Sequence, residues 1–127
     1  MSEKRQLAAI MFTDIVSYTS LIGSDEDKAF EILQKNRDVH NELIPRFNGR
    51  IIKEMGYGIL ASFSTSSDAV RCAIEIQRQY EEDPDFKLRI GIYQGEVIME
   101  DGDVFGDGVN IASRLEPLAP VGGIYIS

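Results

Sequence analysis

The segment Ile10–Val16 constrains the fold most, because it is an apolar run with one carboxylate, Asp14, near its end. Apolar runs of about four to eight residues are typical of strands buried in a sheet. A charge in such a place is costly unless another group pairs with it or a metal ion binds it. A polar turn, Ser17–Ser20, follows, so we expect Asp14 at the C-terminal mouth of the strand. Two interpretations stay open: Asp14 caps the next helix, or it is a metal ligand.

Length and charge exclude several classes of protein. The 127 residues suggest one domain with its own core. The net charge of −8 argues against nucleic-acid binding, since such modules carry a basic face. No apolar run approaches the ~20 residues of a membrane span, and residues 1–6 lack the apolar part of a signal peptide. Cys72 is the only cysteine and His40 the only histidine. A disulfide within the chain, a His-ligated zinc site and a Ser-His-Asp triad therefore each lack the partner residues they need. We expect a reducing, cytoplasmic location.

The hydrophobic periodicity predicts an alternation of strands and helices. The predicted strands are 7–16, 50–54, 59–64, 88–99 and 124–126; the predicted helices are 25–47, a segment that starts at 65–68 and ends before 83–85, and 107–115. Gly91 and Gly95 suggest a bend or bulge in the fourth strand. His40 and Cys72 lie on or beside apolar helix stripes, so we interpret both as core residues.

The order of these elements defines the predicted fold class, α+β. Its first six elements form a ferredoxin-like βαββαβ core, an antiparallel sheet with helices on one face, and an extra helix and strand follow. In this topology the first strand lies beside the second strand of the hairpin. Asp14 should therefore lie beside Tyr57, in the hairpin turn.

Four further residues have chemistry of their own. Lys53 precedes the hairpin turn and Asp103 lies in a second turn, while Asn110 and Arg114 are four positions apart on one helix face. Arginine offers a planar fork suited to phosphate, and asparagine offers both a donor and an acceptor. Taken singly, each has an ordinary structural explanation, such as an exposed strand charge or a helix-end charge.

Four stretches together resemble the class III adenylate/guanylate cyclase catalytic domain. They are Phe12-Thr13-Asp14-Ile15, Lys53-Glu54-Met55-Gly56-x-Gly58, Leu88-Arg89-Ile90-Gly91-Ile92 and Val104-Phe105-Gly106-Asp107-Gly108-Val109-Asn110-Ile111-Ala112-Ser113-Arg114-Leu115-Glu116. The resemblance covers almost the whole chain in the right order. It implies that residues 1–127 are such a domain, which in the family continues beyond the position of Ser127 with a hairpin that supplies a triphosphate-binding lysine.

The resemblance also implies an activity and a set of roles. The family forms cyclic AMP and pyrophosphate from ATP in intracellular signalling, with Mg²⁺ or Mn²⁺, as a head-to-tail homodimer or as a heterodimer with another cyclase domain. Asp14 matches a metal aspartate, with the Ile15 carbonyl as an extra ligand. Lys53 and Asp103 match the pair that recognises adenine. Asn110 matches the residue that orients the ribose, and Arg114 the arginine that stabilises the transition state.

The sequence departs from the family pattern at two positions of the expected site. The second metal aspartate of the family falls at Tyr57, and a phenol that titrates near pH 10 is a poor Mg²⁺ ligand. Some members carry a phosphate-contacting arginine in the strand where this chain has Glu96. Three interpretations therefore stay open: a cyclase with a weakened site, an inactive module that dimerises or binds nucleotide, or a subunit that completes a partner's metal site.

Overall fold

The computed structural model describes residues 4–83 and 86–127. Its elements are β1 (Lys4–Ile15), α1 (Tyr18–Ser24), α2 (Glu26–Arg46), β2 (Gly49–Met55), β3 (Gly58–Phe63), α3 (Ser66–Arg78), β4 (Leu88–Glu100), β5 (Asp103–Phe105), α4 (Asp107–Leu115), the 3-10 turn η1 (Glu116–Leu118) and β6 (Ile124–Ile126). Every predicted strand and helix is present. Among the described residues no helix has both the length and the apolar character needed to cross a membrane.

The sheet has β1 at its centre. Its order is β2-β3-β1-β4-β5, and β6 pairs with β4. The pairs along β2-β3-β1-β4-β5 are antiparallel, whereas β6 runs parallel to β4. With β3 and β4 on either side of β1, the ferredoxin-like core is confirmed. The sheet also curls, because β2 and β5, from opposite ends of the strand order, contact each other.

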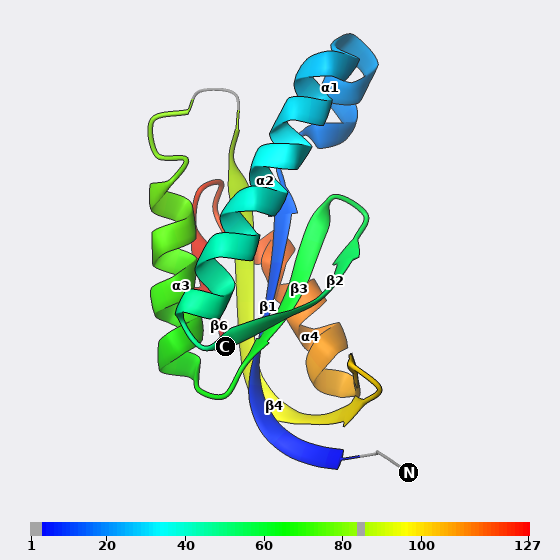
Figure 1. The fold of residues 1–127 in the computed structure, drawn as a ribbon, viewed down its shortest axis with the longest axis vertical. Coiled ribbons are helices and arrows are strands. Elements are labelled where there is room, and N and C mark those ends of the chain that lie inside the picture. Colours follow the sequence, from blue (N-terminus) through cyan, green and yellow to red (C-terminus); the bar gives the residue numbers. More distant parts are fainter. Residues whose placement is uncertain (1–3, 84–85) are drawn as a thin grey trace.

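The two faces of the sheet are covered by different helices (Figure 1). Along β1, Ala9 and Met11 pack into the core shared with α2 and α3, whereas Ile10 and Phe12 pack into a second core that includes Ala112 of α4. This alternation follows from the two-residue period of a strand. The helices α2 and α3 lie on one face as predicted, and α4 covers the opposite face.

The helix starts follow capping chemistry. Asp25 accepts a hydrogen bond from the Lys28 amide at 3.0 Å before α2, and Thr65 accepts one from the Asp68 amide at 3.2 Å before α3. The interpretation of Ser17–Ser20 as a polar turn is wrong beyond Ser17, since α1 begins at Tyr18. The buried Tyr18 hydroxyl donates to the Ala29 carbonyl at 2.9 Å, and this contact anchors α1 to α2.

A buried polar contact joins α2 to β1 at the residue that precedes Asp14. His40 Nδ1 lies 2.7 Å from the Asn36 carbonyl, which can only accept, so Nδ1 carries the proton. His40 Nε2 therefore accepts from the Thr13 hydroxyl at 2.9 Å. Burial lowers the pKa of His40 to about 4. The expectation of a packed, hydrogen-bonded histidine is confirmed.

Candidate active site

Asp14 lies at the end of β1, between two neighbouring strands. Its Cα partners are Gly58 on β3 and Arg89 on β4. Tyr57 precedes Gly58 in the hairpin turn, so the predicted proximity of Asp14 and Tyr57 is confirmed. The residue that precedes α1 is Ser17, three positions after Asp14, so Asp14 is not the cap of the next helix. Its side chain is half-buried, and burial raises its pKa.

A second carboxyl group, Glu116, contacts Asp14. Glu116 is the first residue of η1 and only 5% exposed. Burial and then the charge of Asp14 raise the pKa of Glu116 to about 7, while Arg89 opposes this shift. Burial and the neighbouring Asp14 charge thus favour the protonated form of Glu116, the more strongly shifted of the two carboxyl groups. No role was assigned to Glu116 from the sequence. The one local feature that could have drawn attention to it is an acidic side chain between the apolar Leu115 and Pro117.

Gly91 allows Glu116 to reach this position. A Cβ atom on Gly91 would lie 2.5 Å from the Glu116 backbone nitrogen and 2.9 Å from its Cα. The pairing of β1 with β4 runs continuously from Lys4 opposite Met99 to Ile15 opposite Leu88. Of the bend or bulge suggested for Gly91, this continuous pairing rules out the bulge, and the glycine is needed for the close approach of η1 to β4.

Replacing Gly91 by alanine should destabilise the chain. The new methyl group meets backbone atoms, so η1 must move away from β4, and overpacking of this kind costs about 1–3 kcal/mol of unfolding free energy. Urea unfolding measures the loss. The control is Gly23→Ala in α1, where a Cβ atom would have no neighbour within 4 Å among the described residues; helix propensity predicts no loss there. Equal stability of the Gly91 and Gly23 variants would contradict the packing described.

Glu116→Gln should change how stability depends on pH. The folded pKa of about 7 exceeds the ordinary value of 4.5, so Glu116 contributes stability that is present below pH 4.5 and is lost as the pH rises through 7. Glutamine mimics the protonated acid at every pH. We expect the variant to match the unaltered chain near pH 4.5 and to exceed it by about 1–3 kcal/mol at pH 8. Denaturant unfolding at both pH values checks this, with the exposed Glu42→Gln as control.

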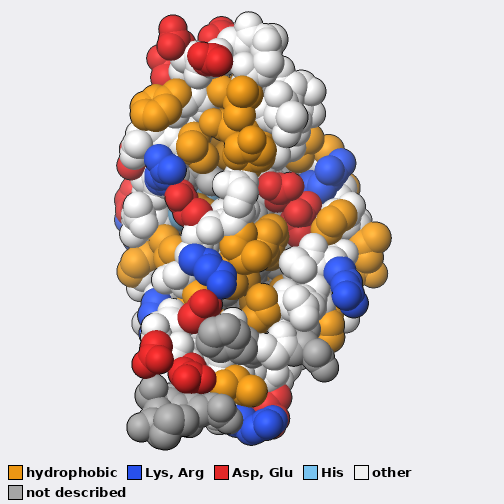
Figure 2. All heavy atoms as spheres, turned by 90° about the vertical axis from the view of Figure 1, so that its right-hand side faces the viewer, with side chains coloured by type: hydrophobic (Ala, Val, Ile, Leu, Met, Phe, Trp, Pro, Cys, Tyr) orange, Lys and Arg blue, Asp and Glu red, His pale blue; other side chains and the backbone are white. Residues whose placement is uncertain are grey.

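Tyr57 packs against α1. It is 38% exposed, and its ring centroid lies 4.3 Å from that of Tyr18. On the other side of the hairpin, Glu54 accepts two hydrogen bonds from Arg37 of α2, at 2.7 and 3.2 Å. Glu54 thus points toward α2, on the face opposite to that of its neighbour Lys53, as expected from the alternation of side chains along a strand, and it does not replace the missing aspartate. Figure 2, which looks onto the right-hand side of the Figure 1 view, shows hydrophobic side chains gathered there, with acidic and basic groups between them.

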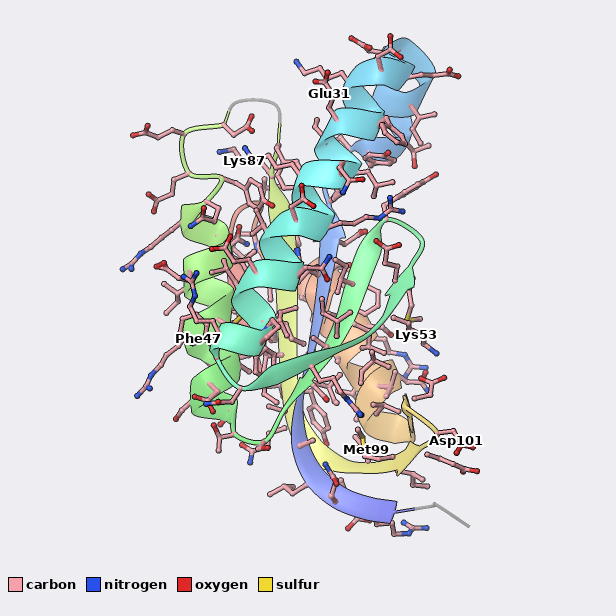
Figure 3. All side chains as sticks on the ribbon, viewed as in Figure 1. Glu31, Phe47, Lys53, Lys87, Met99 and Asp101 are labelled. Atoms are coloured by element: carbon pink, nitrogen blue, oxygen red, sulfur yellow. The ribbon has the colours of Figure 1, made fainter. Side chains whose placement is uncertain are left out.

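Lys53 and Asp103 meet across the curl of the sheet. Lys53 Nζ lies 3.1 Å from Asp103 Oδ2, although the residues come from β2 and β5. Figure 3 shows Lys53 near the β4–β5 turn that Asp101 marks. The Val104 amide donates to Asp103 Oδ1 at 2.7 Å; this bond, followed by the one from Lys53, lowers the pKa of Asp103. The two side chains are 43% and 33% exposed, which leaves the pair accessible to a ligand.

Asn110 and Arg114 both lie exposed on α4. The Ser113 hydroxyl donates to the Asn110 backbone carbonyl at 2.8 Å, a bond that does not involve the Asn110 side chain. Within residues 4–83 and 86–127, no hydrogen bond or ion pair joins Asn110, Arg114 or the Lys53–Asp103 pair to Asp14.

The donor atoms around Asp14 fit one hard cation rather than two. The described residues contain no group of three or more His, Cys, Asp or Glu side chains arranged to hold a metal ion. Mg²⁺ usually binds through one or two carboxylates together with phosphate oxygens. The half-buried Asp14 at the strand end can supply one such carboxylate. The phenol of Tyr57 is a poor ligand for a second hard cation.

The chain belongs to the adenylate and guanylate cyclase catalytic domain family, which it matches over residues 1–127. A protein of Rhizobium meliloti (strain 1021) with an adenylate cyclase name is 39% identical over 99% of this chain and 23% of its own length. An adenylate cyclase of Streptomyces coelicolor is 30% identical over 93% of this chain and 32% of its own length. The chain thus spans about a quarter to a third of these curated relatives.

Solved structures show the same fold. An adenylate/guanylate cyclase/hydrolase from Silicibacter pomeroyi is 39% identical, with a TM-score of 0.83, over 98% of this chain and 77% of that one. The catalytic core of a rhodopsin-guanylyl cyclase with converted specificity, in complex with ATPαS, has a TM-score of 0.90 at 24% identity, over 100% of this chain and 80% of that one. The second likeness shows the fold alone.

Proposed function

We propose that this chain is the catalytic domain of an adenylate cyclase whose turnover is weakened by Tyr57. The reaction is ATP to cyclic AMP and pyrophosphate: the ribose 3′-oxygen forms a bond to the α-phosphorus as the bond to pyrophosphate breaks. The observation that carries the proposal is the Lys53–Asp103 pair, assembled at 3.1 Å and still accessible. Adenylate cyclase names among the relatives support the choice of ATP.

The Lys53–Asp103 pair suits adenine. Lysine donates to a ring nitrogen and aspartate accepts from the exocyclic amine. Guanine has a carbonyl at the corresponding position, so the carboxylate would face another acceptor. Leaving a buried polar group unpaired costs about 1–3 kcal/mol, and this difference favours ATP over GTP.

The remaining residues have roles around the triphosphate. The Asp14 carboxylate and the Ile15 carbonyl would hold Mg²⁺ or Mn²⁺ that enters with the nucleotide. When bound, such an ion neutralises phosphate charge and activates the attacking oxygen. Asn110 orients the ribose. Arg114 offers its guanidinium to the charge that develops on the phosphoryl group, without transferring a proton.

A head-to-tail dimer would bring the two groups of residues together. Asp14 of one subunit would face Lys53, Asp103, Asn110 and Arg114 of its partner, which fits the lack of a direct hydrogen bond or ion pair between them among the described residues of one chain. The partner is a second copy of this chain or another cyclase domain.

A second candidate function follows from Tyr57. Its ring is packed against Tyr18, and this part of the site contributes an aromatic surface where the family has a carboxylate. A chain of this kind can bind nucleotide or complete a partner's metal site without efficient turnover of its own. Such a subunit would still present Lys53, Asp103, Asn110 and Arg114 to the partner's metal site.

Adenine preference tests the proposed function. We expect a non-hydrolysable ATP analogue to bind about 10–100-fold more tightly than the GTP analogue. Lys53→Ala should remove most of this difference. The matched control is Lys35→Ala, because Lys35 also forms a surface ion pair, at 3.2 Å with Asp83. Equal or tighter binding of the GTP analogue would show that Lys53 and Asp103 do not read adenine.

A further inference from the structure

A cavity of about 290 Å³ lies at the end of the sheet where β1 begins. Figure 3 shows Met99, one of its lining residues, at this end of the sheet. None of the residues that the proposed function assigns to nucleotide or metal lines the cavity. Its polar lining comes from β1, from β2 and β3, and from the residues next to these two strands: Gln6, Asn48, Arg50, Ser62 and Ser64.

The strand register directs three of these side chains toward a common space. Ser62 lies opposite Ile10 of β1 on one side and opposite Arg50 of β2 on the other. Opposed residues of antiparallel strands project on the same side of a sheet, so all three share the face on which Ile10 packs into the core near α4. Gln6 is on β1 at an even spacing from Ile10, and the two-residue period of a strand places it on that face as well.

The polar side chains of this cavity have no partners of their own. Among residues 4–83 and 86–127, no hydrogen bond or ion pair engages the side chains of Gln6, Asn48, Arg50, Ser62 or Ser64. Most other basic residues do form ion pairs: Arg5, Lys35, Arg37, Arg46, Lys53 and Arg78. Ser62 is only 8% exposed, yet its hydroxyl is not among the buried unpaired side-chain atoms of the described chain, so it is reached from the cavity. Buried polar groups are normally hydrogen-bonded, which leaves this hydroxyl to a partner from outside the chain.

The donors in the cavity suit a ligand with one negative charge. Arg50 offers a planar guanidinium that can bind a carboxylate through two parallel hydrogen bonds, and the amides of Gln6 and Asn48 add neutral donors. Phosphate groups are typically bound at a helix N-terminus or by several cations, and the described lining has neither. Ala8 and Met99 add an apolar wall. A volume of about 290 Å³ is at the lower end of the range for ligand pockets, so the ligand is small.

We propose that this cavity binds a small organic carboxylate, which Arg50 holds by its guanidinium and Ser62 by its hydroxyl. The site goes beyond the proposed function, since it uses other residues and a different ligand. Gln6 and Asp14 lie near opposite ends of β1, separated by roughly 26 Å of strand at ~3.3 Å per residue. A ligand at Arg50 therefore leaves the end of the sheet at Asp14 open.

The test is a titration of the ¹⁵N-labelled chain, followed by the NMR chemical shifts of its backbone amides. Benzoate and butyrate are the probes, because each carries one carboxylate on a short apolar body. Benzamide has nearly the shape of benzoate without its charge, and inorganic phosphate has charge without an apolar body. The shifts report both the dissociation constant and the place where each compound binds, and the dispersion of the spectra checks that every variant is folded.

We expect benzoate or butyrate to bind saturably, with a dissociation constant of about 1 mM or lower and the largest shifts at residues that line the cavity. Arg50→Gln removes the charge and should weaken binding about 10–100-fold, and Ser62→Ala removes one hydroxyl and should weaken it about 2–10-fold. Arg71→Gln is the matched control and should bind like the unaltered chain, because Arg71 is also exposed and forms no ion pair among the described residues.

Several results would overturn the proposal. Saturable binding of neither carboxylate, or shifts that centre on α1 or α4, would show that the cavity is not the site. Equal affinity for benzamide, or tighter binding of phosphate, would show that the ligand class is wrong. Binding by Arg50→Gln as tight as that by Arg71→Gln would remove the role of the guanidinium. The titration contains no nucleotide and no metal, so its outcome is independent of whether Lys53 and Asp103 recognise adenine.

Discussion

Replacing Tyr57 by aspartate is expected to raise cyclic AMP formation by about 10²–10³-fold, from a rate at or near background. The new carboxylate would lie in the hairpin turn beside Asp14, whose Cα partner is Gly58. A second anionic ligand would hold the ion that activates the 3′-oxygen, which Asp14 alone retains poorly. The measurement is cyclic AMP production from ATP with Mg²⁺ or Mn²⁺.

Two controls separate charge from packing at Tyr57. Tyr57→Asn has nearly the same size as the aspartate variant but no charge, and it should stay inactive. Tyr57→Phe keeps the ring that packs 4.3 Å from Tyr18, and it should resemble the unaltered chain. If Tyr57→Asp gains no activity, Tyr57 is not what silences the site. Turnover by the unaltered chain at an ordinary enzymatic rate would show that a second aspartate is not required.

Replacing His40 by alanine is expected to lower the unfolding free energy by about 2–4 kcal/mol. His40 is fully buried, so its removal leaves a cavity. It also leaves the Thr13 hydroxyl without the acceptor it has at 2.9 Å. The exposed neighbour Asn41→Ala on the same helix is the control. A loss for His40→Ala no larger than that for Asn41→Ala would contradict the buried hydrogen bond.

His40 also gives stability a defined dependence on pH. Its pKa falls from 6.5 to about 4 on burial, so the unfolded chain binds more protons between these values. Its contribution is therefore present above pH 6.5 and is lost as the pH falls to 4. Glu116 acts in the opposite direction between 4.5 and 7. The comparison of each variant with the unaltered chain isolates one group, whereas the total pH profile does not.

The sequence predicts the sheet well because its signals are local. Adjacent residues alone identify three of the elements: the apolar run Ile10–Val16 marks a strand, the glycines around Tyr57 mark a hairpin, and the cap at Thr65 marks a helix. Helix α1 is missed because it is short, ends in Gly23-Ser24, and begins after Ser17 in a left-handed conformation with φ of 62°. Its anchor, the bond from Tyr18 to Ala29, is tertiary and leaves no mark in the local pattern.

The candidate site is predictable only in part. The family resemblance indicated Asp14, Lys53, Asp103, Asn110 and Arg114, and in the fold Lys53 meets Asp103. The contact between Glu116 and Asp14 could not be predicted, because it depends on how closely η1 approaches β4 at Gly91. The sequence suggested a bend or bulge there, but a glycine in a strand can equally signal a close backbone approach. Only the three-dimensional arrangement distinguishes the two.

Isothermal titration of a non-hydrolysable ATP analogue, with and without Mn²⁺, tests the central claim most directly. The claim is that this chain binds an adenine nucleotide together with a divalent cation, through Lys53, Asp103 and Asp14. We expect saturable binding that becomes tighter when Mn²⁺ is present. The absence of binding under both conditions, or the same affinity with and without Mn²⁺, would contradict it.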